Sequence, residues 1–344
     1  MSRLDQEQDV IDLADELGLE GNPVDAIIGF CQQKIVRWNN EAGPVETIAK
    51  LETVVAANLN LVFEEFFSDE ELSDAIRKYT SDGEAAFAAL GFLFDDGTFG
   101  TMMERRNVAH DAPDRFVAFI DCRGDKAARR FFTRWHEIAH LLVLEKELTE
   151  PVHRSTDAPL ERLMDEIAGH VGFFDQLFQP LLAKLHTDTH LSFEVIEAIR
   201  EAFCPEASFQ STMFACHRRV ATPLVYLEAA MGFKKDEERQ LNSKQQSLFE
   251  VEQPVAKLRI LTVVPNGKAK KEKMYVTKKM RVPASSIVQQ AYLGDSEQGV
   301  SGYENLSSWE HSSGTCLADV DVYIEARRVA DRVIAIIQKH EAVN

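Results

Sequence analysis

Apolar side chains recur every three or four residues through the N-terminal segment 1–80. The stretch Pro44–Leu59 shows the pattern clearly, because Ile48, Leu51 and Val55 fall on one face of a helix. We therefore expect residues 1–80 to form an amphipathic helical layer.

Three short segments with apolar or alternating residues follow this layer. They are Phe92–Phe94, Thr98–Glu104 and Arg115–Asp121, and Asp-Gly or Asp-Ala-Pro sequences lie between them. Alternation bounded by such turn sequences is typical of strands. A small sheet is therefore predicted after the helical layer.

Helical spacing returns beyond residue 125. Asp125 is a candidate N-cap for a helix over Lys126–Leu144, and a second helix is predicted over Ala158–Leu185. Two further helices are predicted over Ser192–Phe203 and Phe209–Met231.

The pattern changes at a polar stretch, Lys234–Gln253. Beyond it, Leu258–Val264 is typical of a strand, and the apolar residues of Val322–Lys339 fit one face of a helix. We therefore predict an α+β protein. A mainly helical domain with a small sheet is expected over 1–235, a linker over 236–254, and a mixed α/β domain over 255–344.

Composition favours a globular protein of a reducing compartment. Hydrophobic residues make up 45% of the chain and charged residues 27%, which is ordinary for folded domains. The acidic N-terminus predicts no signal peptide, and the longest apolar run, Ala85–Phe94, is short of the roughly 20 residues that span a bilayer. Scattered cysteines in odd number favour free thiols and hence a cytoplasmic location. They are Cys31, Cys122, Cys204, Cys216 and Cys316.

One basic segment interrupts a chain whose net charge is -18. This charge disfavours nucleic-acid contact over most of the surface, but the segment 268–281 could follow a single-stranded backbone and stack one base on Tyr275. A solvated hairpin is the alternative. The basic residues are Lys268, Lys270, Lys271, Lys273, Lys278, Lys279 and Arg281.

The predicted helix 126–144 carries an H-E-x-x-H motif. His136 and His140 are four residues apart, so both imidazoles face the same way and can reach one zinc ion. Glu137 lies beside that face and can take a proton from a metal-bound water, whose pKa zinc can lower to about 7. The motif predicts a zinc site with Glu137 as general base.

A catalytic zinc has three protein ligands and one open position. Glu161 and Asp165 lie four residues apart on the predicted helix 158–185. We expect Glu161 to be the third ligand and Asp165 to orient a histidine through its free N–H. Glu166 is the alternative ligand. It is also possible to interpret Glu161, Asp165 and Glu166 simply as solvated charges on the helix surface. His170 is expected to be a polar neighbour.

Several other residues are candidates for roles near the metal. Cys122 ends the strand before the H-E-x-x-H helix, where a thiolate could cap the open position and inhibit the enzyme; burial as a small apolar side chain is the alternative. His153, His217 and Tyr226 could stabilise an oxyanion, and the sequence does not choose among them.

These motifs resemble the ImmA/IrrE family of metallopeptidases. That family typically has R-F-T-x-A-H-E-x-x-H on the zinc helix and E-x-x-A-N/D-x-F-A downstream. Here Phe132-Thr-Arg-Trp precedes His136, and Glu161-Arg-Leu-Met-Asp-Glu-Ile-Ala168 follows, with Met164 and Ile167 in place of Ala and Phe. The similarity covers 45–230 and is strongest over 115–175.

The resemblance implies a zincin-like peptidase domain followed by a GAF-like sensor domain over 255–344. Family members cleave helix-turn-helix repressors after stress, often DNA damage, and some accompany mobile elements or phage-defence operons. It thus implies a regulated zinc endopeptidase whose signal could be single-stranded DNA. The alternatives are a general zinc aminopeptidase or oligopeptidase, and a non-catalytic zinc-containing binding protein. A purely structural site has no use for a base such as Glu137, which argues against the last.

Overall fold

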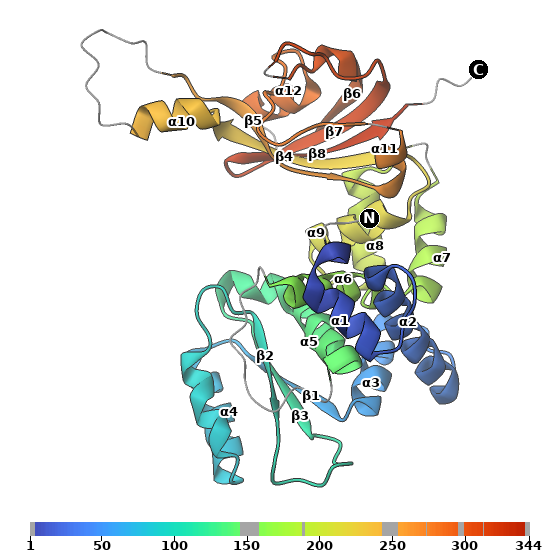
Figure 1. The fold of residues 1–344 in the computed structure, drawn as a ribbon, viewed down its shortest axis with the longest axis vertical. Coiled ribbons are helices and arrows are strands. Elements are labelled where there is room, and N and C mark those ends of the chain that lie inside the picture. Colours follow the sequence, from blue (N-terminus) through green and yellow to red (C-terminus); the bar gives the residue numbers. More distant parts are fainter. Residues whose placement is uncertain are drawn as a thin grey trace. The chain divides into compact units, whose positions relative to one another are not determined.

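The computed structural model describes residues 4–144, 158–187, 190–242, 254–272, 274–294, 299–311 and 313–340. The protein is α+β, and its chain forms two compact units (Figure 1). Unit 1 consists of Met1–Thr187 and Ile196–Ala215, and unit 2 consists of Asp188–Val195 and Cys216–Asn344.

Unit 1 begins with a helical layer, as its apolar spacing predicts. Polar side chains start its helices: Asn22 caps α2 by accepting from the Asp25 N–H, and Thr47 caps α3 in the same way. The elements are η1 (Leu4–Gln6), α1 (Gln8–Glu16), α2 (Pro23–Ala42), α3 (Ile48–Asn58), α4 (Asp69–Ser81) and η2 (Ala85–Phe92).

Unit 1 also contains a three-stranded sheet with the order β1-β3-β2. Its strands are β1 (Leu61–Phe66), β2 (Gly100–Glu104) and β3 (Phe116–Asp121). The central strand β3 is buried along its whole length; it pairs parallel with β1 and antiparallel with β2. The predicted strand 92–94 is wrong, because Phe92 ends the 3-10 helix η2. Strand β1 was not expected within 1–80, and it gains its pairing only from β3, far along the chain.

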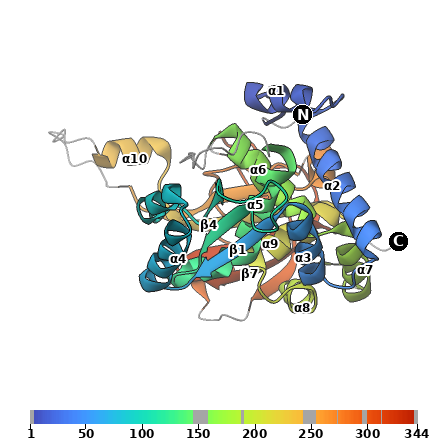
Figure 2. The same ribbon diagram turned by 90° about the horizontal axis from the view of Figure 1, so that it is seen from below.

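Helices α5 (Arg130–Leu144) and α6 (Pro159–Val171) lie against each other (Figure 2), and α2 packs against both. A 3-10 turn, η3 (Gly124–Arg129), precedes α5, so Asp125 lies inside a turn and does not cap the helix. The predicted helix 158–185 divides, because α6 ends at Val171 and α7 (Asp175–Leu185) begins anew. The helices α8 (Phe193–Phe203) and α9 (Phe209–Arg219) follow.

Unit 2 is built on a five-stranded antiparallel sheet with the order β5-β4-β8-β7-β6. Its strands are β4 (Leu224–Gly232), β5 (Lys257–Pro265), β6 (Val300–Asn305), β7 (Asp321–Val329) and β8 (Arg332–Lys339). Its described helices are α10 (Lys235–Asn242), α11 (Gly267–Lys271), α12 (Ile287–Leu293) and the turn η4 (Leu306–Ser308). One face of the sheet buries Val225, Ile260, Ile324 and Ile337 in a core that includes Trp309.

Of two predicted helices that reach into this unit, one is too long and the other is wrong. The helix 209–231 ends at Arg219, and Leu224–Gly232 is strand β4 instead. The helix 322–339 is the hairpin β7–β8, whose turn places Ala330 at a φ of 54°. The apolar residues of this segment fit the period of a helix and also that of a strand. Pairing of β8 with β4 and of β7 with β6 selects the strand conformation.

The boundary between the two units lies earlier in the chain than the boundary predicted after residue 235. Strand β4 lies between β5 and β8, so the chain from Cys216 onward belongs to unit 2. The first part of the predicted linker, 236–242, belongs to helix α10, and 243–253 lies outside the described residues.

Candidate metal centre

Helix α5 carries the two histidines on the edge of its buried face. Phe131, Trp135 and Ile138 pack into the core of unit 1, which fixes the rotation of the helix. His136 and His140 then lie one turn apart with their Nε2 atoms 3.2 Å from each other. The predicted helical spacing therefore brings both imidazole nitrogens to one point.

Helix α6 brings Glu161 to the same point. Its Oε2 atom lies 3.1 Å from His136 Nε2 and 3.4 Å from His140 Nε2. The three atoms form a group that could hold a metal ion, the one such group found among the described residues. Glu166, the alternative ligand, and His170 are not part of it.

The size of this triangle fits a tetrahedral ion. Ligands at the usual zinc distances of about 2.0 to 2.1 Å stand about 3.3 Å apart in a tetrahedron. The three measured edges, 3.1, 3.2 and 3.4 Å, bracket that value. The residues present therefore suit a zinc-sized ion with a fourth position left for another ligand.

Asp165 sets the chemistry of His136 from the other side of the ring. Its Oδ1 lies 2.9 Å from His136 Nδ1, one helical turn beyond Glu161. If Nδ1 carries the proton and donates it to Asp165, the Nε2 lone pair points at the carboxylate of Glu161 and at His140. Three electron pairs then converge on one point, where a metal ion could bind.

The acid–base properties of the group reflect this convergence. Burial lowers the pKa of His136, but hydrogen bonds to Asp165 and Glu161 outweigh it and raise the pKa to about 10. Burial raises the pKa of Glu161, but hydrogen bonds from His136 and His140 outweigh it and lower the pKa below its usual range. The donors are thus arranged to stabilise positive charge at their centre.

Glu137 is buried beside the group and approached by the backbone of β2. Burial raises its pKa, while the charges of His140 and His136 act in the opposite direction. A Cβ atom at Gly100 would lie 2.7 Å from Glu137 Oε1 and 2.6 Å from Thr133 Cγ2. Only glycine leaves room for this carboxylate, a requirement that a lone glycine in the sequence does not reveal.

Strand β2 presents backbone groups at the edge of its sheet. Asp121 N–H donates to Phe99 O, and Arg105 N–H donates to Arg115 O. In this antiparallel pair, the odd-numbered residues of β2 are therefore those whose backbone groups are hydrogen-bonded to β3. The N–H and C=O groups of Gly100 and the next even-numbered residues therefore point away from β3. Among the described strands β2 pairs with β3 alone.

Lys126 braces the segment that leads into β2. Its ammonium donates to the backbone oxygens of Asp95 and Thr98, at 2.6 and 3.0 Å, and to Asp121 Oδ2 at 2.9 Å. Burial raises the pKa of Asp121, but hydrogen bonds from Arg123 and Lys126 outweigh it and lower the pKa to about 2. This buried carboxylate thus holds the cation that positions Gly100.

Arg134 anchors α5 on the opposite side from the metal group. Its guanidinium lies 3.0 Å from Glu52 of α3, 2.5 Å from Glu65 of β1 and 2.7 Å from Glu206. The side chain is 10% exposed, so its loss would leave three carboxylates close together. No local pattern predicts this role for Arg134, because its partners lie far away along the chain.

Cys122 occupies the region of these ion pairs and is not part of the metal group. Its side chain is buried at the end of β3, and the nearby charges are those of Glu65, Arg130 and Arg134. Burial is the main reason why its pKa rises to about 11. The thiol is therefore protonated near neutral pH, as expected for a packed side chain.

None of the three candidate oxyanion donors belongs to the metal group found among the described residues. His153 lies outside the described residues. Within unit 2, the Tyr226 hydroxyl donates to Glu228 at 2.8 Å, and His217 Nε2 lies 2.9 Å from Val264 O. Burial lowers the pKa of His217 to about 4, so it is neutral near pH 7.

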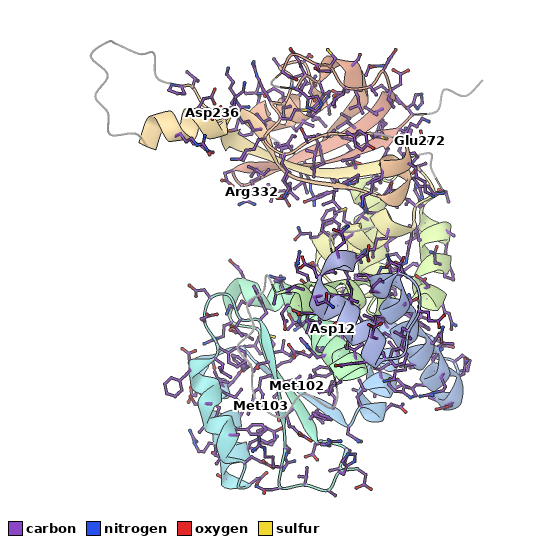
Figure 3. All side chains as sticks on the ribbon, in the orientation of Figure 1. Asp12, Met102, Met103, Asp236, Glu272 and Arg332 are labelled. Carbon is purple, nitrogen blue, oxygen red and sulfur yellow. The ribbon has the colours of Figure 1, made fainter. Side chains whose placement is uncertain are left out.

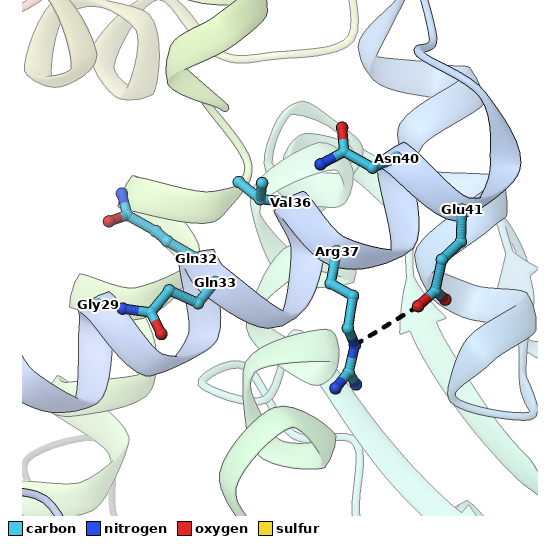
Figure 4. Close-up of a pocket in the computed structure, with 7 residues that line it drawn as sticks. All are labelled: Gly29, Gln32, Gln33, Val36, Arg37, Asn40 and Glu41. Carbon is cyan, nitrogen blue, oxygen red and sulfur yellow. Dashed lines mark ion pairs between the residues drawn. The ribbon is translucent and has the colours of Figure 1, made fainter.

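A pocket elsewhere in unit 1 is unrelated to this chemistry. It runs along the outer face of α2 from Gly29 to Glu41, has a volume of ≈ 630 Å³, and contains the pair Arg37–Glu41 at 3.9 Å (Figure 4). None of the metal-centre residues lines it, so we assign the candidate site to α5 and α6.

Comparison with models of known protein families gives no match, and comparison with curated proteins gives no significant one. No helix among the described residues is long and apolar enough to cross a membrane.

Proposed function

We propose that this protein is a zinc-dependent endopeptidase whose active centre is formed by His136, His140, Glu161 and Glu137. The observation that carries the proposal is the triangle of ligand atoms, because its edges fit tetrahedral zinc and leave a fourth position. The buried carboxylate of Glu137 beside this triangle favours a catalytic centre over a structural one.

Zinc would act as a Lewis acid at this position and lower the pKa of a coordinated water to about 7. Glu137 is the group that accepts the proton. Its buried carboxylate has a raised pKa, and a base is most effective when its pKa approaches the working pH. Asp165 keeps the Nε2 lone pair of His136 directed at the metal position.

The substrate we propose is an extended polypeptide. The outward N–H and C=O groups of Gly100 and Met102 can pair with such a chain, which adds a strand to the sheet. Gly100 is next to Glu137, so the added strand would run past the base. Pairing of this kind uses the middle of a chain and needs no free terminus, which favours an endopeptidase over an aminopeptidase.

We also propose that this peptidase activity is regulated. The resemblance of the sequence to ImmA/IrrE peptidases supports a helix-turn-helix repressor as substrate, with a zincin-like unit 1 and a GAF-like sensor in unit 2. It also supports a stress or DNA-damage signal, such as single-stranded DNA, acting in the cytoplasm.

The test measures zinc content and cleavage on the same preparations. Wild type should contain about one zinc per chain, and a chelator should remove both metal and activity. The substrates are an unfolded protein with a blocked N-terminus and any helix-turn-helix repressor that a neighbouring gene encodes. Internal cleavage sites identified by mass spectrometry support an endopeptidase.

Variants separate the alternatives. His136→Ala with His140→Ala should lose zinc, whereas Glu137→Gln should keep zinc and lose cleavage, because an amide cannot accept the proton. Glu166→Gln serves as the matched control and should behave as wild type. Full zinc without cleavage of any substrate by wild type would favour the non-catalytic binding protein, and release of single N-terminal residues would favour an aminopeptidase.

A further inference from the structure

Arg259 of β5 is a buried cation with an unfilled donor. Its exposed fraction is 2%, its Nη1 donates to Lys279 O at 3.2 Å, and its Nη2 lies 3.3 Å from Glu237 Oε2. Its Nε is buried and has no hydrogen-bond partner in the part of the chain that the structure describes. Burying a guanidinium with a donor left over is unfavourable unless an anion compensates for it.

Further cations surround this arginine within unit 2. Arg281 lies directly opposite Arg259 in an antiparallel bridge, so two like charges face each other across neighbouring backbones. Such pairs destabilise a sheet. Lys279 lies two residues before Arg281, and Lys234 and Lys257 are near enough for their charges to act on Glu237.

Helix α10 supplies the counter-charges. Glu237 pairs with Arg259 at 3.3 Å and Glu238 pairs with Lys279 at 3.0 Å, whereas Asp236 and Arg239 of the same helix are exposed. The helix has eight residues, a length that is marginal without packing. Two carboxylates on a short helix therefore pair with these cations.

The basic segment 268–281 does not form one patch. Lys268, Lys270 and Lys271 belong to α11, which follows the last residue of β5, whereas Lys279 and Arg281 lie beside its first residues. Figure 3 shows the two regions at opposite ends of the sheet, marked by Glu272 after α11 and by Asp236 of α10. Lys273 lies outside the described residues.

We propose that Arg259, Lys279 and Arg281 form a binding site for a phosphate group, and that Glu237 and Glu238 of α10 occupy it when no ligand is bound. A guanidinium offers donors in a planar fork that matches two phosphate oxygens, which would also satisfy Nε. Inorganic phosphate or a phosphate monoester carries nearly the charge of the two carboxylates that it replaces, and a backbone phosphodiester carries about half of it. The phosphate could come from a free nucleotide or from a nucleic-acid backbone.

The experiment measures binding of inorganic phosphate, a nucleoside monophosphate and a single-stranded oligonucleotide to the full chain by titration calorimetry. Replacing both carboxylates, Glu237→Gln with Glu238→Gln, should tighten binding of the phosphate probes about tenfold, because it removes two competing ion pairs. Arg259→Met should weaken binding by tenfold or more, and the exposed variant Arg281→Gln should weaken it in the same direction. Lys271→Met on α11 removes the same charge elsewhere and should leave phosphate binding unchanged.

The two sources of phosphate separate by salt dependence. Oligonucleotide binding that is much tighter than phosphate binding and falls steeply with salt identifies a nucleic-acid backbone, and equal affinities identify a free ligand. Unchanged affinity in the double Gln variant, or wild-type affinity in both arginine variants, would overturn the proposal. The titrations are repeated in Glu137→Gln protein, so a failure of the proposed peptidase function does not affect them.

Discussion

Gly100 of β2 lies directly against Glu137 of α5, so close that a Cβ atom on the glycine would come within 2.7 Å of the carboxylate. Real side chains do not tolerate such a contact, and Thr133 blocks the same position at 2.6 Å. A side chain at position 100 would therefore have to displace the Glu137 carboxylate or the Thr133 methyl group.

Gly100→Ala should displace Glu137 and reduce kcat/KM for polypeptide cleavage on the order of 100-fold, since catalysis depends steeply on the position of the base. Zinc content should not change, because the ligands come from α5 and α6. Gly97→Ala is the matched control, because a Cβ there meets Asp95 Oδ1 at an ordinary 3.5 Å. Equal activity of the two variants would show that the contact has no catalytic consequence.

Asp165→Asn should lower zinc affinity about 10- to 100-fold while the fold is retained. The carboxylate accepts from His136 Nδ1 at 2.9 Å and thereby directs Nε2 to the metal position. Competition with a chelator of known affinity measures the effect. An affinity within twofold of wild type would mean that His136 is oriented without this contact.

Asp121 should make the protein sensitive to acid. Its pKa is about 2, below its ordinary value of 3.8, so the folded state favours the ionised form. This stabilisation, about 2 kcal/mol, is complete above the ordinary value and is lost as the pH falls from about 4 to about 2. Urea unfolding should show that Asp121→Asn is less stable than wild type at pH 7, with the difference shrinking below pH 4. A difference that is constant with pH would contradict this origin.

Ala330→Gly should stabilise the protein by about 1 kcal/mol. Ala330 turns the β7–β8 hairpin at a φ of 54°, a left-handed conformation that costs a residue with a Cβ and suits glycine. Thermal or urea unfolding measures the change, and Ala335→Gly in the buried part of β8 should destabilise instead. Loss of stability in Ala330→Gly would show that the turn conformation is not strained.

The sequence by itself determined the candidate metal site of this protein, because the spacing of its residues is local. Two histidines four residues apart on a helix share a face whatever surrounds them, and the same holds for Glu161 and Asp165. The structure places these four side chains together as the spacing predicted. The helices of the N-terminal layer followed for the same reason, since a period of 3.6 is written in neighbouring residues.

Only the tertiary structure decided the features that depend on distant partners. Strand β1 forms because β3 lies beside it, and the segment 322–339 became a hairpin because β4 and β6 pair with it, although its apolar spacing also fits a helix. The same is true of Gly100 against Glu137 and of Arg259 beneath α10. A glycine or an arginine has no local signature for such a role, because the steric or electrostatic demand comes from residues that only folding brings near.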